Sequence, residues 1–303
     1  MPPRPRAAGY RAWGIAFAFA GVIAFSFRPI LIKLAYAAYP VAPVTLLFLR
    51  MAIALPFFTA IGWWLRARAP KLAPRDWAGI AGLGFIGYYM ASFLDFLGLQ
   101  WVGAGLGRLI LFIYPTLVLL LSLAFLKKRP SRRQLAALAL SYVGIALVVS
   151  NRFGGHAQGG PFLLGVSLVF GSSLCYAIYL VAGSQMVQRV GSMRFTSYSM
   201  IFATLPAVAQ FFVLEPLSAL DLPSAVWWYA IVMAVFSTVL PVFLVAEALR
   251  RIGANHFALI GAVGPVTTAI AGAVGLEEQL NWLQAAGGTL VIFGVLLVSM
   301  KRS

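Results

Sequence analysis

Apolar segments about as long as a membrane is thick recur along this 303-residue chain. A helix needs about 20 predominantly apolar residues to cross the ~30 Å hydrocarbon core of a bilayer. Charged residues make up only 10% of the chain, whereas soluble domains carry roughly 25%. The sequence therefore predicts an all-α membrane protein with ten transmembrane helices, joined by short loops that contain Pro and Gly. The predicted helices are residues 12–36, 43–65, 77–98, 103–126, 132–150, 161–185, 195–214, 224–249, 254–276 and 281–300.

The second half of the sequence repeats the first at an offset of 150 residues. Twelve residues between positions 103 and 148 recur unchanged 150 positions later; Gly103 and Pro115, for example, return as Gly253 and Pro265. With five helices in each repeat, the second repeat enters the membrane from the opposite side. Such inverted repeats enclose a midplane site that either face of the membrane can reach in turn, which points to a transporter. We predict one repeat at residues 1–150 and the other at 151–303.

Basic residues are concentrated in alternate loops. If the N-terminus is cytoplasmic, eighteen Lys and Arg residues fall in inner loops and tails, and Arg152 alone falls in an outer loop. This asymmetry is what the positive-inside rule requires, so we expect both termini in the cytoplasm. The first apolar run is too long, and too interrupted by Arg28 and Lys33, for a cleaved signal peptide, so we interpret it as a retained helix.

Four basic residues and one acid fall inside the predicted helices: Arg28, Lys33, Arg50, Asp95 and Arg108. At ~1.5 Å per residue they all lie in the outer half of the membrane, where an unpaired charge costs several kcal/mol. In one interpretation Lys33 extends to the membrane surface and Asp95 pairs with Arg108. In the other, the excess positive charge forms a cavity that attracts a carboxylate or phosphate group. Arg28 and Arg50 have no evident partner in the sequence, which favours binding for at least one of them.

Neutral polar and aromatic side chains fall roughly half way along the predicted helices, and so do Pro115, Pro241 and Pro265. Tyr with Ser or Thr suits an amphipathic small molecule; the alternative is ordinary packing, in which Ser and Thr hold helices together. The prolines interrupt the helical hydrogen bonds, and an acid or a histidine could carry a proton. The candidate binding residues are Arg28, Lys33, Arg50, Tyr88, Tyr89, Ser92, Tyr114, Ser173, Tyr176 and Ser237, and Ser172, Thr238 and Thr267 share their depth. The candidates for coupling or gating are Asp95, Arg108, Pro115, Pro265 and His256.

Three motifs extend over nearly the whole chain. The first helix contains FSFRPILIKLAY, with Lys33, and the next contains LLFLRMAIALP, with Arg50. The fourth helix reads GRLILFIYPTLVLLLSLAFL and has a counterpart in FALIGAVGPVTTAIAGAVGLEEQL. The last helix of each repeat carries a glycine, Gly144 or Gly294. In these motifs the chain resembles the drug/metabolite transporter superfamily, in the ten-helix bacterial branch built from two EamA-type repeats.

One position departs from that resemblance. The first repeat has Lys127 and Lys128 where the family usually has Gly-Glu, while the second repeat keeps an acid, Glu277. The resemblance otherwise implies a multi-pass transporter of the bacterial inner membrane that exports or exchanges small metabolites, most often amino acids. It also implies that a gradient drives transport without ATP. The sequence leaves open whether a proton is the coupling ion and whether the chain forms a homodimer.

Other functions fit the sequence less well. A passive facilitator, or a drug, nucleoside or sugar transporter, would use the same scaffold. A membrane enzyme is disfavoured because neither an HExxH nor a Gly-x-Ser-x-Gly motif is present. One cysteine, Cys175, and two histidines, His156 and His256, give no basis for a metal site, and we expect no cofactor. The net charge of +16 follows from the loop asymmetry, so we expect no nucleic-acid partner.

Overall fold

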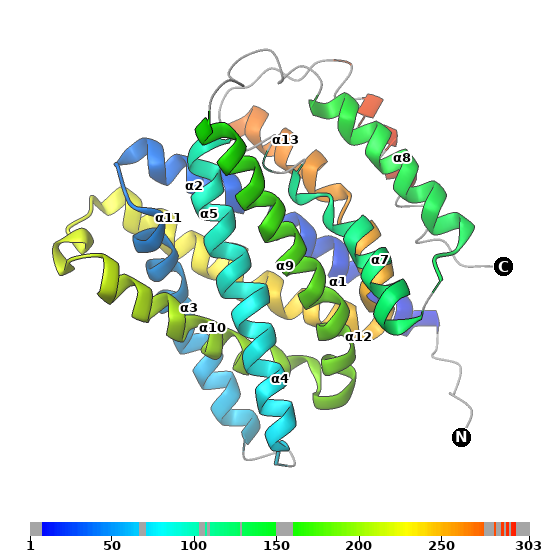
Figure 1. Ribbon diagram of the computed structural model, residues 1–303, viewed down its shortest axis with the longest axis horizontal. Coiled ribbons are helices and arrows are strands. Elements are labelled where there is room, and N and C mark those ends of the chain that lie inside the picture. Colours follow the sequence, from blue (N-terminus) through cyan, green and yellow to red (C-terminus); the bar gives the residue numbers. More distant parts are fainter. Residues whose placement is uncertain are drawn as a thin grey trace.

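The protein is described by a computed structural model, in which residues 8–66, 71–102, 107, 110–127, 129–149, 160–275, 282, 286–287, 289–290 and 292–294 are placed. All regular secondary structure in these residues is helical (Figure 1). Six helical stretches are long and apolar enough to cross a membrane, which makes the chain a multi-pass membrane protein. They are Gly9–Ala38, Pro43–Arg66, Pro74–Trp101, Pro161–Val190, Ser192–Leu214 and Ser224–Ile260.

These six stretches fall on six of the ten predicted helices. The predicted helix at 103–126 contains a shorter apolar helix, α7 (Tyr114–Leu126), and α8 (Arg132–Val149) follows it. A further helix, α13 (Val263–Gly275), lies in the predicted segment 254–276. Most of the tenth predicted segment lies outside the described residues, so the count of ten helices stays a prediction.

Several of the membrane-crossing stretches are broken near their middle. The first consists of α1 (Ala8–Ser26) and α2 (Arg28–Ala38), with a turn at Phe27. Pro29 cannot donate a backbone hydrogen bond, so the chain can restart as a helix there without a further loss.

Two other stretches each contain a π-helical turn. In the first half α4 (Pro74–Gly84) leads through η1 (Phe85–Met90) into α5 (Ala91–Trp101). In the second half α11 (Ser224–Ala234) leads through η4 (Val235–Val239) into α12 (Leu240–Ile260). The bounds of α4 and α11 differ by 150 residues at both ends, and η1 and η4 begin 150 residues apart. The sequence repeat therefore has a counterpart in local structure.

Helices from the two halves interlock. The first helix of one half packs on the third stretch of the other, as α1 on α12, and the equivalent pair, α9 (Gly160–Val190) on α5, does the same. Between them α3 (Pro43–Arg66) packs along its own equivalent, α10 (Ser192–Leu214). In Figure 1, α5 and α9 run side by side through the middle of the view, and α3 and α10 cross to their left. The centre is thus built equally from both halves.

Close packing between the halves depends on small residues at the contacts. Gly84, at the end of α4, lies so near α10 that a Cβ atom there would be 2.3 Å from the backbone oxygen of Ser199. Backbone atoms cannot shift cheaply, so this contact requires glycine. Gly82, two residues earlier on the same helix, is exposed and would bring a Cβ within 4 Å of nothing described.

We predict opposite effects for alanine at these two glycines. Gly84→Ala should lower the apparent melting temperature of the detergent-purified protein, because overpacking costs about 1–3 kcal/mol. Gly82→Ala should leave it unchanged or raise it, because alanine favours a helix by up to ~1 kcal/mol. Equal melting temperatures for the two variants would contradict the close contact between α4 and α10.

Candidate functional site

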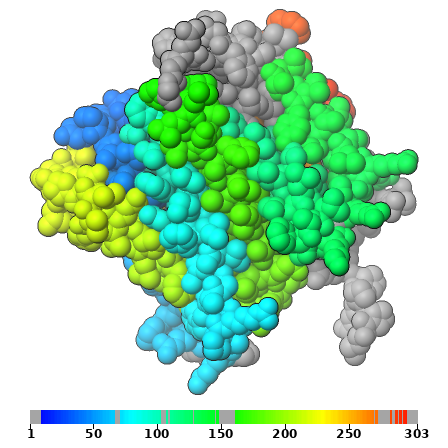
Figure 2. Space-filling view, viewed as in Figure 1, coloured from blue at the N-terminus to red at the C-terminus, as the bar shows by residue number. Residues whose placement is uncertain are grey.

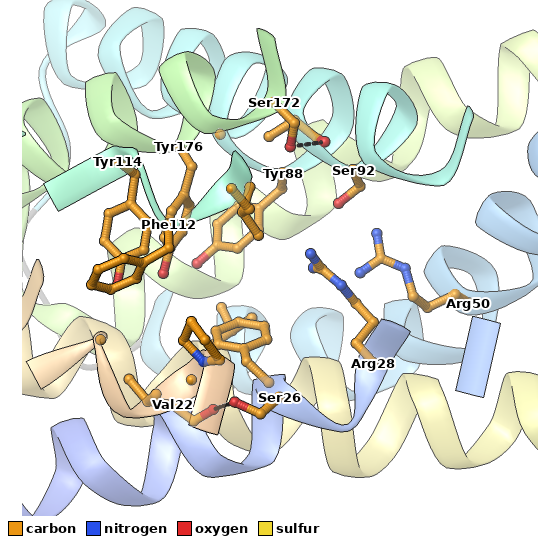
Figure 3. Close-up of a pocket in the computed structure, with 18 residues that line it drawn as sticks. Val22, Ser26, Arg28, Arg50, Tyr88, Ser92, Phe112, Tyr114, Ser172 and Tyr176 are labelled. Carbon is orange, nitrogen blue, oxygen red and sulfur yellow. Dashed lines mark hydrogen bonds between the residues drawn. The ribbon is translucent and has the colours of Figure 1, made fainter. Parts of the chain in front are cut away.

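A central cavity lies where the broken helices meet (Figure 3). Its walls come from the junction of α1 and α2, from α3, from η1 with α5, and from α9. The first residues of α7 and α13 and the turns before them, with Val242 of α12, complete it. Irregular backbone at membrane depth is tolerated where it borders protein or a cavity of this kind. The cavity has a volume of about 70 Å³, measured as the space open to the centre of a water-sized sphere. At ~10–15 Å³ per water, it has room for a few water molecules.

The cavity has a cationic end and an aromatic end. Figure 3 shows the guanidinium groups of Arg28 and Arg50 side by side near Ser92. At the other end lie the rings of Tyr114 and Tyr176, whose centroids are 5.2 Å apart in an edge-to-face arrangement. Such a cavity matches a small molecule with a negative group at one end and an apolar body.

Arg28 forms an ion pair with Asp95 across this cavity wall. The Arg28 Nη2 atom lies 2.9 Å from Asp95 Oδ2, and Asp95 is only 3% exposed. The junction of α1 and α2 places the arginine, and α5 places the acid. The sequence-based view that Arg28 lacks a partner is therefore wrong. The predicted partner of Asp95, Arg108, lies outside the described residues.

Arg50 is the largest fully buried side chain in the described chain, with 1% of its surface exposed. Its Nη1 donates to Thr238 Oγ1 at 3.3 Å, its Nη2 approaches Met51 Sδ at 3.6 Å, and its guanidinium lies 5.3 Å from the centre of the Phe96 ring. Within the described residues no carboxylate pairs with it, and its Nε atom has no hydrogen-bond partner.

The charges of this end of the cavity do not balance. Among the described residues, Arg28 and Arg50 bring two positive charges to this end and Asp95, paired with Arg28, brings one negative charge, which leaves an excess of one positive charge. The Nε atom of Arg28, like that of Arg50, is buried without a hydrogen-bond partner in the described part of the chain. Buried charges in proteins are normally paired. The arrangement can therefore accept an anionic group, and a carboxylate or phosphate would supply both the missing charge and the missing hydrogen bonds.

The candidate serines have different roles. Ser92 lines the cavity. Ser173 donates to the backbone oxygen of Leu111 at 2.9 Å. In a continuous helix this oxygen would accept a hydrogen bond from residue 115, but Pro115 has no N–H to donate. Ser237 donates to the oxygen of Met233 one turn earlier at 3.1 Å. Ser173 and Ser237 therefore satisfy backbone groups, and neither lines the cavity.

The candidate tyrosines also divide. Tyr88 lines the cavity and shares a hydrogen bond of 2.7 Å with Tyr179, which the sequence-based selection missed. Tyr89 points elsewhere: its ring stacks on Phe93 and tilts against Phe85. Figure 3 labels Tyr88, Tyr114 and Tyr176 around one space, so three of the four predicted tyrosines come together.

Lys33 and His256 lie away from the cavity lining. The Nζ atom of Lys33 donates to the backbone oxygen of Leu99 at 2.6 Å, in the last turn of α5. A cation at this end of a helix satisfies a free carbonyl and complements the helix dipole. His256 lines a separate cavity with Arg250 and Asn255.

Of the two candidate prolines, Pro265 lines the central cavity and Pro115 stands next to it in the first turn of α7. The lining also includes Gly261 and Leu111, four residues before each proline, which the sequence-based selection missed. Counting back one helical turn from the prolines would have found both. A side chain at Gly261 would require Tyr114 to move, because its Cβ would fall 1.5 Å from Tyr114 Oη.

The chain is similar over most of its length to known transporters. The EamA-like transporter family matches it twice, over residues 12–150 and 163–300. An uncharacterized transporter of Bacillus subtilis, YcbK, is 30% identical over 288 residues, which cover 93% of this chain and 91% of YcbK. The threonine/homoserine exporter RhtA of Escherichia coli is 28% identical over 227 residues, covering 73% of this chain and 69% of RhtA.

The fold also resembles a solved one. A protein of known crystal structure superposes with a TM-score of 0.76 at 16% identity, covering 94% of this chain and 96% of that protein. At this identity the likeness concerns the fold alone.

We predict strong energetic coupling between Arg28 and Asp95. Asp95→Asn should destabilise the protein by about 3–5 kcal/mol, because it leaves Arg28 buried without a counter-ion. The double variant Arg28→Gln/Asp95→Asn should lose less than the sum of the single variants, as measured by unfolding of the purified protein.

An ion pair between a half-exposed arginine and Asp76, which is 7% exposed, provides the control. Arg189 Nε lies 2.9 Å from Asp76 Oδ1, but the arginine side chain is 53% exposed, so the same cycle with Arg189→Gln and Asp76→Asn should give at most about 1 kcal/mol. If the losses in unfolding free energy of the two single variants at Arg28 and Asp95 simply add up in the double variant, the two residues are not coupled.

Proposed function

Because the chain belongs to the EamA-like transporter family, we propose that it is a secondary active transporter of small organic metabolites that carry a carboxylate. Amino acids are the first class to test. One relative, RhtA, is 28% identical to this chain and is named a threonine/homoserine exporter. We place the protein in the bacterial inner membrane, with ten helices in two inverted repeats (residues 1–150 and 151–303) and both termini in the cytoplasm.

The unbalanced charge of the central cavity carries this proposal. Among the described residues, Arg28 and Arg50 contribute two positive charges against the one negative charge of Asp95, and all three side chains have little exposure to solvent. A substrate carboxylate between the two guanidinium groups would restore neutrality. Tyr88, Tyr114 and Tyr176 would then contact the rest of the molecule.

Alternating access is supported by the paired contacts between the halves. The packing of α1 on α12 has its equivalent in α9 on α5, so the two halves can exchange their arrangements with little change in the contacts formed. The present cavity holds only a few waters. Rocking of helix groups about α3 and α10 would widen it toward one face at a time.

Asp95 is the coupling candidate that the geometry favours, ahead of His256. A proton on Asp95 would remove its charge and release Arg28 from the ion pair, so proton binding and anion binding would act on the same arginine. Pro115 and Pro265 stand at helix breaks beside the cavity and are the candidate gating positions.

Counterflow in liposomes tests the proposal. The purified protein would be reconstituted in vesicles loaded with a pool of unlabelled amino acids, and uptake of each labelled amino acid would be measured. Saturable uptake is expected. Arg50→Gln should raise the half-saturating concentration by roughly tenfold or more, because a hydrogen bond to a charged group is worth about 1.5–3 kcal/mol. The half-saturating concentration of Arg50→Lys should lie between those of wild type and Arg50→Gln, because lysine keeps the charge but lacks the planar guanidinium group.

Stability measurements separate a binding role for Arg50 from a structural one. Since Arg50 has no described carboxylate partner, Arg50→Gln should leave the apparent melting temperature of the empty protein unchanged or higher. Arg75→Gln, at an exposed position far from the cavity lining, controls for the lost charge and should transport like wild type.

Three outcomes would count against the proposal. A lower melting temperature together with normal transport in Arg50→Gln would make Arg50 structural. Uptake that is linear in concentration would indicate a passive facilitator. No uptake of any amino acid would move the search to nucleosides, sugars and drugs.

A further inference from the structure

A second hollow lies at the opposite end of α3 from the central cavity. It is formed by the last turns of α3, the residues just before and in the first turn of α4, and the first turns of α10. Figures 1 and 2 show the end of α3 and the start of α4 together at the lower edge of the molecule. The centre of a water-sized sphere can occupy about 520 Å³ here. The residues that matter below are Gly62, Trp63, Arg66, Lys71, Arg194 and Tyr198.

Three cationic side chains line this hollow: Arg66, Lys71 and Arg194. No aspartate or glutamate is among its described lining residues. The nearest described acid along the chain, Asp76, is already engaged by Arg189 at 2.9 Å. The hollow is therefore an electropositive site, and an anion would complement it.

Aromatic side chains give the site a fixed floor and an apolar edge. Tyr198 donates its hydroxyl to the backbone oxygen of Gly62 at 3.2 Å, which joins α10 to α3, and its ring packs on Trp77 at 4.7 Å between centroids. Trp63 is 76% exposed at the rim. Exposed tryptophan beside Lys and Arg is typical of a helix end at the membrane surface, where the indole lies among lipid headgroups.

We propose that this hollow binds an anionic phospholipid of the cytoplasmic leaflet. Its phosphodiester would lie between Arg66, Lys71 and Arg194, and an acyl chain would run along Trp63 toward the hydrocarbon. The loop charges place this end of α3 at the cytoplasmic face, where anionic lipids meet basic pockets between helices. A soluble phosphate would use the three cations but gain nothing from the exposed indole.

The bound lipid would bridge the two halves of the protein, because α3 comes from the first half and α10 from the second. It would thus stabilise the contact about which the helix groups are proposed to rock. The lipid site itself does not depend on the proposed transport function, since its binding is measured without any transport substrate.

Lipid binding to the detergent-purified protein tests the proposal. Dioctanoyl phosphatidylglycerol would be titrated and the bound lipid counted by native mass spectrometry, with dioctanoyl phosphatidylcholine as the zwitterionic probe and glycerol 3-phosphate as the soluble one. We expect one phosphatidylglycerol to bind more tightly than either comparison molecule. Arg66→Gln/Lys71→Gln should weaken it by roughly 25-fold, because each basic residue near a lipid surface contributes a factor of about 5.

The matched control removes two charges elsewhere on the predicted cytoplasmic face. Arg132→Gln/Arg133→Gln lies at the exposed start of α8, away from the hollow, and should bind phosphatidylglycerol as wild type does. An equal loss in this control would overturn the proposal in favour of a diffuse charge effect. Wild-type affinity in Arg66→Gln/Lys71→Gln, or equal binding of the zwitterionic lipid, would also overturn it.

Binding of the soluble probe, and failure of the double variant to fold, are also covered by the test. If glycerol 3-phosphate binds as tightly as the lipid, the site recognises a soluble anion and the lipid proposal is wrong. If Arg66→Gln/Lys71→Gln fails to give a monodisperse protein, the single variants carry the test, and each should weaken binding roughly fivefold.

Discussion

A helix that is interrupted inside a membrane must satisfy the backbone groups that the interruption frees, and this requirement shapes the centre of the protein. The breaks at Phe27, before Pro115 and before Pro265, and the π-turn η1, all gather around one space. Ser173 illustrates the solution, since its hydroxyl binds the Leu111 oxygen that Pro115 leaves without a donor. Hydrocarbon offers no hydrogen bonds, so broken helices are stable only where they face one another or water. The cavity is the consequence of the breaks.

The charged side chains at the cavity are the feature that suggests a binding role. Arg28 and Asp95 neutralise each other, and the pair alone would be a structural contact. Arg50 changes the balance, because it brings a second guanidinium to the same space with a hydroxyl, a thioether and a ring as its described neighbours. A buried cation in such surroundings reduces the stability of the empty protein and is retained where a ligand can complete it. In the proposed function, the aromatic end would then select what the ligand carries besides its negative group.

The two halves contribute to this site in different ways. Arg28, Arg50 and Asp95 all come from the first half, whereas Thr238, Gly261 and Pro265 come from the second. The backbone repeats, with equivalent helices and π-turns 150 residues apart, but the charges do not. In the proposed transport cycle, the repeated frame would permit equivalent open states toward the two faces, and the asymmetric set of side chains would let one substrate bind at its centre.

The sequence by itself determined the membrane class and the repeat. Hydrophobic segment length and proline position are local properties, so six predicted spans and the breaks near Pro115 and Pro265 can be found without coordinates. Only the tertiary structure decided which residues meet. Asp95 forms its ion pair with Arg28, and Lys33 binds a backbone oxygen at the end of α5. Tyr88 lines the cavity, whereas the ring of Tyr89 stacks on Phe93 outside it. The reason is rotational: depth along a helix follows from counting residues, whereas the face that a side chain presents depends on how helices far apart in the sequence pack together.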